Sequence, residues 1–199
     1  MRVPQIDLLL GEYHAKHDLR MVPIKVDHLI EIVKNRGFVK ELQVEALDYE
    51  HRHILGGVKM YGLAYESQSE RALIYFNKSL IKELERFVVC KELCHIVLDQ
   101  GGSKVTSVDQ LQSLVEALAA KNINLKPSVS EQLAYACAIE LLFPIELRSM
   151  HREAYKQGEI SAHQLMLRYG IPERFVEVAM YDDYIEMCTN HIRKNRIEI

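Results

Sequence analysis

Apolar positions in the first part of the chain recur with helical spacing and predict two helices. The first covers residues 6–17, and Val22-Pro23 then interrupts the pattern. The second is expected to be capped by Asp27, to run through residues 28–33 and to end at Arg36-Gly37. The chain is therefore expected to begin with two short helices.

Strand-like segments follow at residues 42–47, 58–66 and 72–76. Gly56-Gly57 and the polar run 67–70 have the composition of turns between them. Residues 72–76 are continuously apolar and bounded by polar residues, a pattern typical of a buried strand. We therefore predict a small sheet, with antiparallel strands.

The rest of the chain has a helical pattern. Helices are expected over residues 80–99, 108–121, 131–142, 146–156, 162–169 and 172–192. The order of helices, small sheet and more helices predicts an α+β class, with helices covering one face of the sheet. We expect one domain over residues 1–199.

Composition restricts the function classes. The chain has 199 residues, and 48% are hydrophobic and 27% charged, which is typical of a globular protein. The net charge of -3 argues against a protein built mainly to neutralise phosphates. No apolar run approaches the roughly 18–20 residues that span a bilayer, and the first residues do not form a signal peptide. Together with four cysteines that lack C-x-x-C spacing, this predicts a cytoplasmic protein without a membrane partner.

The strongest candidate chemistry lies in Lys91-Glu92-Leu93-Cys94-His95, which is the H-E-x-x-H zinc motif with lysine in place of its first histidine. On a helix, Lys91 and His95 are separated by about 40°, so they share one face. Glu92 and Cys94 each lie about 80° from the midpoint of that pair, on opposite sides. Glu92 can serve as a base, and Cys94 is a possible substitute ligand.

A third ligand has to come from another element, and Glu131 is the best candidate. It stands near the start of an apolar helix whose residues Ala134, Ala136 and Ala138 permit close helix packing. The alternative is an exposed glutamate favoured by the helix dipole. For Lys91, the alternative to a site residue is an ordinary surface lysine.

Two segments resemble the ImmA/IrrE family of zinc metallopeptidase-like proteins. The first spans residues 72–95, with Asn77, Arg86-Phe87 and E-x-x-H, and is similar to the family pattern R-x-F-T-x-A-H-E-L-G-H. The second spans residues 131–144 and is similar to E-x-x-A-N-x-F-A-x-x-L-L-M-P. Residues 23–27 and 165–178 are similar as well, so the resemblance covers about residues 20–180. It implies a zincin-like fold.

The resemblance also implies roles for individual residues. His95 and Glu131 correspond to metal ligands and Glu92 to the general base. An extended substrate would pair with the edge of a strand formed by Ala72, Leu73, Ile74, Tyr75 and Phe76. Family members often act on a helix-turn-helix transcriptional repressor, which makes a repressor-like protein or a peptide the expected partner.

Lys91 is the main departure from the family pattern. A lysine binds zinc only after losing a proton, against an unperturbed pKa of about 10.4. His95 and Glu131 alone are two ligands, whereas catalytic zinc has three and a water. Our hypothesis is that the Lys91 ammonium replaces the charge of the metal and pairs with Glu92 or Glu131. Alternatively, Cys94, His95 and Glu131 hold a shifted metal.

Two functions remain open from the sequence. One is a non-catalytic regulatory protein with a degenerate site that binds no zinc, or binds it weakly, and engages a repressor-like partner. The other is an active zinc-dependent endopeptidase that cleaves a cytoplasmic transcriptional regulator.

Two features near the C-terminus are interpreted as structural. Residues 160–180 have the outline of a helix-turn-helix, but the second helix is rich in acidic residues, so we expect no direct binding to nucleic acid. The basic cluster at residues 191–196 is expected to be a solvated terminus.

Overall fold

The structure is a computed structural model that describes residues 3–48, 54–61, 71–98, 104–107 and 129–193. The helix expected at residues 108–121 lies outside the described residues, as does the last part of the strand expected at 58–66. None of the described helices is long and apolar enough to cross a membrane.

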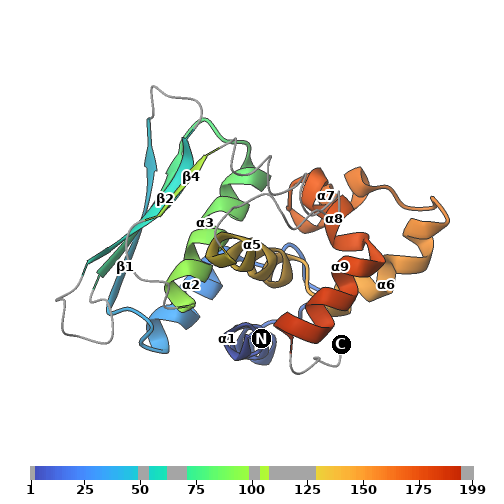
Figure 1. The fold of residues 1–199 in the computed structure, drawn as a ribbon, viewed down its shortest axis with the longest axis horizontal. Coiled ribbons are helices and arrows are strands. Elements are labelled where there is room, and N and C mark those ends of the chain that lie inside the picture. Colours follow the sequence, from blue (N-terminus) through green and yellow to red (C-terminus); the bar gives the residue numbers. More distant parts are fainter. Residues whose placement is uncertain (1–2, 49–53, 62–70, 99–103, 108–128, 194–199) are drawn as a thin grey trace.

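Helices make up most of the described chain (Figure 1). They are α1 (Pro4–Lys16), α2 (Val26–Asn35), α3 (Lys82–Val97), α5 (Val129–Leu142), α6 (Ile145–Lys156), α7 (Ala162–Tyr169), α8 (Glu173–Met180) and α9 (Asp182–Met187), which continues into a π-helical segment at Cys188–Ile192. The strands are β1 (Glu41–Leu47), β2 (Ile54–Tyr61), β3 (Arg71–Asn77) and β4 (Lys104–Ser107).

The four described strands form one sheet in the order β1-β3-β2-β4. Strand β2 is antiparallel to both β3 and β4, whereas β1 is parallel to β3. The predicted α+β class is confirmed, but the expectation of an antiparallel sheet is wrong for β1. The reason is the strand order: β1 and β2 run in opposite directions, but β3 lies between them, so β1 pairs with the next strand but one, which runs in the same direction as β1.

The strand expected to offer a substrate-binding edge, Ala72–Phe76, is an inner strand. One edge of β3 pairs with β1 and the other with β2, so neither edge is available to an added strand. The edge predicted there is therefore wrong. The continuous apolar pattern of these residues indicates a strand with covered faces, and it does not specify whether its edges are paired.

Gly56 and Gly57 were expected in a turn, but they lie inside β2, opposite Phe76 and Tyr75 of β3. The register between β2 and β4 shifts between Ile54 and Gly56. Glycine inside a strand often marks a bulge of this kind, because it accepts the irregular backbone. The glycine pair therefore lies at an irregularity within one strand and does not form a turn between two strands.

The described helices cover one face of the sheet, with α3 as the central element (Figure 1). Helix α3 packs on β2 and β3 on one side and on α5 on the other, and α2 contacts β1. Residues 87–97 of α3 are all buried. A helix buried on every side has no solvent face for a charged residue, so any charge on it needs a partner inside the protein.

Two helix boundaries differ from the prediction. Asp27 does not cap α2: the N-cap is Lys25, and no side chain accepts a hydrogen bond there. The single helix expected over residues 172–192 is divided at Tyr181, which has an extended backbone with φ -69° and ψ 139°.

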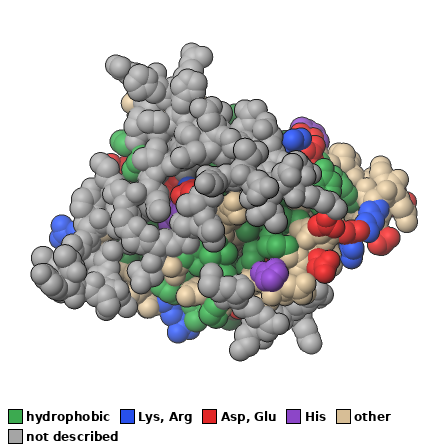
Figure 2. Space-filling view, in the orientation of Figure 1, with side chains coloured by type: hydrophobic (Ala, Val, Ile, Leu, Met, Phe, Trp, Pro, Cys, Tyr) green, Lys and Arg blue, Asp and Glu red, His purple; other side chains and the backbone are tan. Residues whose placement is uncertain are grey.

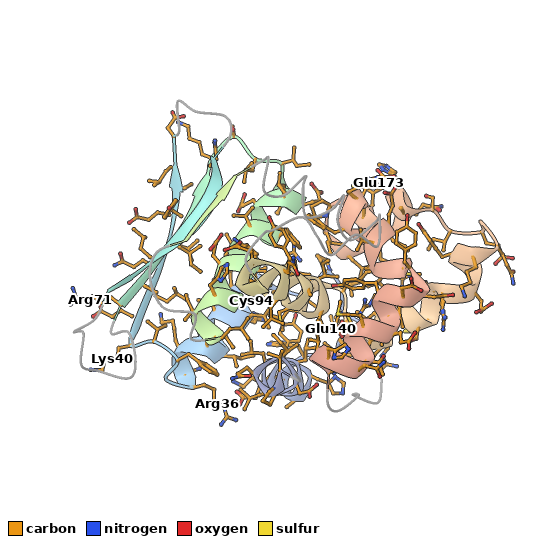
Figure 3. All side chains as sticks on the ribbon, viewed as in Figure 1. Arg36, Lys40, Arg71, Cys94, Glu140 and Glu173 are labelled. Atoms are coloured by element: carbon orange, nitrogen blue, oxygen red, sulfur yellow. The ribbon has the colours of Figure 1, made fainter. Side chains whose placement is uncertain are left out.

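Ile192 and Arg193 are folded into the protein, which contradicts the expected solvated terminus at these positions, whereas residues 194–196 of the basic cluster lie outside the described residues. Val3 N donates a hydrogen bond to Ile192 O at 3.0 Å, so the two ends of the described chain lie together. Arg193 is buried and its guanidinium contacts three carboxylates, at 2.6 Å from Asp7 Oδ1, 2.8 Å from Glu140 Oε1 and 2.9 Å from Glu146 Oε1. Glu140 lies in the interior on α5 (Figure 3).

Candidate functional site

The predicted site residues come from two helices that pack against each other. Helix α3 contributes Lys91, Glu92 and His95, and the first turn of α5 contributes Glu131. Lys91 and Glu92 are 0% exposed and His95 is 3% exposed. The alternative of a surface lysine at position 91 is therefore wrong.

The four side chains form a compact ionic cluster. Lys91 Nζ lies 3.0 Å from Glu92 Oε1 and 2.8 Å from Glu131 Oε2. The other carboxylate oxygen of Glu131, Oε1, lies 3.1 Å from His95 Nε2. The carboxylate of Glu131 thus joins Lys91 to His95 across the two helices, and the ion pair that the sequence suggested is present. The catalytic and metal-binding roles of these residues remain predictions.

Glu131 is held in its charged form by its neighbours. Burial acts to raise the pKa of its carboxyl group, but the contact with His95 and the charge of Lys91 outweigh burial and lower the pKa to about 2. Its side chain is only 14% exposed, so the alternative of an ordinary exposed first-turn glutamate does not hold.

Tyr135 belongs to the same cluster and was not predicted as a site residue. Lys91 Nζ lies 5.4 Å from the centroid of its ring, within the range of a cation–π contact. The ring also packs against Phe87 and Phe175, and burial raises the pKa of its hydroxyl. The signal in the sequence was its spacing: a residue four positions after Glu131 shares its helix face.

Cys94 does not take part in this cluster. It is fully buried in the hydrophobic core, within the layer of helices behind the sheet (Figure 3). Burial and a contact with Cys90 raise the pKa of its thiol well above the ordinary value. Because zinc binds the thiolate, this environment disfavours Cys94 as a replacement ligand.

The donor set of the described cluster does not fit a catalytic zinc ion. A lysine ammonium group has three hydrogen-bond donors and no lone pair with which to coordinate a metal. That leaves His95 and Glu131, one ligand fewer than catalytic zinc takes from protein. Among the described residues, no group of three or more histidine, cysteine, aspartate or glutamate side chains is placed to hold a metal.

A helix that carries E-x-x-H, packed between a small sheet and a second helix that supplies a glutamate, defines a metallopeptidase-like fold. The model of the IrrE N-terminal-like domain, Peptidase_M78, matches residues 51–181, about two thirds of the chain. The chain therefore belongs to this family, and the ImmA/IrrE resemblance is confirmed. No curated protein and no solved structure matches the chain.

Proposed function

We propose that this protein is a non-catalytic, regulatory member of the family, in which an internal ion pair has taken the place of the metal. The observation that carries the proposal is the position of Lys91 Nζ, within 3.0 Å of Glu92 and 2.8 Å of Glu131. These are the carboxylates that correspond to the base and to one ligand of the zinc site. The ammonium group supplies positive charge where the family has its metal.

The charges explain why such a replacement preserves the fold. Two buried carboxylates without a cation repel each other and lose hydration, which strongly disfavours a folded state. A lysine at position 91 neutralises them without any ligand from solution. The helices α3 and α5 then stay connected by the contact between Lys91 and Glu131 in the absence of metal.

The proposed partner is a protein, with a helix-turn-helix repressor as the first candidate. The support is the family assignment, because the resemblance implies recognition of such regulators. The four cysteines are free, buried thiols, as a reducing cytoplasm allows. Acidic and basic side chains are interspersed over the described part of the C-terminal helices (Figure 2). Asp182, for example, pairs with both Arg152 and Lys156. That mixture favours a protein partner over nucleic acid.

The zinc content of the tag-free protein, measured by elemental analysis without added metal or chelator, tests the proposal. We expect less than about 0.1 zinc per chain and a melting temperature that neither zinc nor a chelator changes, because nothing in the cluster needs the ion. A helix-turn-helix repressor mixed with the protein is expected to bind and to remain uncleaved.

Two substitutions at position 91 distinguish the effect of removing the positive charge of Lys91 from the effect of adding a metal ligand there. Lys91→His restores the third donor, so we expect zinc to bind and to raise the melting temperature of this variant. Lys91→Met removes the charge without adding a donor and is expected to stay free of zinc. If Lys91→His gains no zinc, His95 and Glu131 do not converge on a metal position.

Bound zinc in the native protein would support the alternative function, an active zinc-dependent endopeptidase. About one zinc per chain, lost to a chelator together with thermal stability, would overturn the proposal. Repressor cleavage that Glu92→Gln abolishes without unfolding the protein would do the same.

A further inference from the structure

Strand β1 forms one edge of the sheet, and its other edge has no strand partner among the described residues. Its seven residues pair with β3 in a continuous register from Glu41↔Arg71 to Leu47↔Asn77, without a bulge. It contains neither proline nor lysine, and its charged residues are Glu41 and Glu45. Natural edge strands usually carry a bulge, proline or lysine, because an unprotected edge recruits another strand.

An apolar side chain is exposed at the centre of this edge. Val44 is 38% exposed, although its partner on β3, Ile74, is fully buried. Side chains of paired residues lie on the same face of a sheet, so Val44 extends the apolar face that the helices cover. Because β1 is the outermost described strand on this side of the sheet, one more strand beside it would cover Val44.

We propose that this edge binds the same edge of a second copy of the chain, so that two sheets join into one across a two-fold axis at Val44. In an antiparallel pair with this centre, Val44 lies opposite Val44 of the second copy. Leu42 lies opposite Ala46, so the apolar residues on the helix-covered face meet each other. A two-fold axis through one residue is the geometry of an isologous interface.

The charges select this register over its neighbours. Lys40 lies opposite Asp48 of the second copy, and the symmetry creates this favourable pair twice. A pair centred one residue earlier places Glu41 opposite Glu45, and one centred one residue later places Glu45 opposite itself. Like charges directly opposite are destabilising, so of these three registers only the one centred on Val44 avoids them.

The ends of the strand are compatible with this arrangement. Lys40 and Arg71 lie at the same end of the parallel pair β1 and β3 (Figure 3). Arg71 Nε contacts Glu41 Oε2 at 3.0 Å, which neutralises the first glutamate of the strand inside each copy. At the other end, Asp48 is paired with Lys78 and is 74% exposed, so its carboxylate remains accessible to Lys40 of the second copy.

Analytical ultracentrifugation of the full chain over a range of concentrations provides the first test. We expect a reversible dimer of about twice the 23.1 kDa of one chain. Val44→Glu places two glutamates at the axis and is expected to weaken the dimer about tenfold or more. The matched control Val44→Thr keeps the branched, uncharged shape and is expected to change the dissociation constant by less than about twofold.

Disulfide formation tests the register itself. The native cysteines are all buried, so a new surface cysteine is the only readily oxidised thiol among the described residues. Val44→Cys is expected to form a covalent dimer under mild oxidation, because the two thiols meet at the axis. Glu41→Cys lies on the same strand but opposite Leu47, and is expected to stay monomeric on denaturing gels. A monomer at every concentration, or equal crosslinking of both variants, would overturn the proposal.

Discussion

At the scale of single residues, the effects of substituting Lys91 and Glu131 on the free energy of unfolding should depend on each other, because their charges are in contact inside the protein. Lys91→Met leaves two buried carboxylates without their cation, and we expect the free energy of unfolding to fall by about 3–5 kcal/mol. Adding Glu131→Gln to this variant removes one uncompensated charge, so part of the loss should return. Urea denaturation of both single variants and the double variant gives the coupling energy.

We expect that coupling energy to be about 1–3 kcal/mol. Glu92→Gln, made in the same background, serves as a control for the second carboxylate beside Lys91. Strictly additive effects of Lys91→Met and Glu131→Gln would show that their 2.8 Å contact contributes nothing to stability.

The sequence predicted which side chains of the cluster lie together, because the spacing on one helix fixes which residues share a face, whereas their catalytic and metal-binding roles remain predictions. Lys91, Glu92 and His95 follow from helical periodicity, and Glu131 from a second motif. Tyr135 and Arg193 were missed. The partners of Arg193 lie far away in the sequence, and a basic residue near a terminus is usually solvated. Glu140, a glutamate in the most apolar part of α5, was a usable signal that a buried cation exists.

At the scale of elements, stacked histidines make the contact between α1 and α2 sensitive to pH. The rings of His17 and His28 stack with centroids 4.1 Å apart. Burial, followed by the charges of His28, Lys25 and Lys16, lowers the pKa of His17 below 6.5, although Glu31 acts in the opposite direction. The folded protein therefore prefers the neutral imidazole.

The sign of the pH effect follows from this lowered pKa. As the pH falls through 6.5, the unfolded chain takes up the proton first, so stability is complete above pH 6.5 and declines below it. We expect the urea midpoint to fall between about pH 7.5 and pH 5.5. In the His17→Gln variant this decline should be smaller. An identical decline in both proteins would assign the pH dependence to other groups.

Helices and strands were predicted correctly where nearby residues in the sequence determine them, and less well where distant residues do. The bounds of α6 and α7 follow from their own residues, including the Ser161–Gln164 capping box that begins α7. Strand pairing is not local, because the residues of β1 do not indicate that β3 will lie beside it in a parallel arrangement. The glycines of β2 have the composition of a turn, and only their pairing with β3 shows that they lie within a strand.

At the scale of the whole molecule, Arg193 connects the C-terminal end of the described chain to three helices. Its carboxylate partners belong to α1, α5 and α6, and Glu140 also pairs with Arg148. Breaking a buried pair on one side leaves uncompensated charge, which costs about 3–5 kcal/mol. We therefore expect Arg193→Met to lower the free energy of unfolding by that amount.

The exposed pair Arg174 and Glu177 provides a matched control, because a surface ion pair contributes at most about 1 kcal/mol. Arg174→Met should therefore change stability much less than Arg193→Met, and both are measured by urea denaturation. Hydrogen exchange then locates the effect. Loss of Arg193 should speed exchange in α1 as well as near the C-terminus, because Val3 N bonds to Ile192 O. Faster exchange confined to the last residues would show that the ion pairs of Arg193 stabilise only the end of the described chain and not α1, α5 and α6.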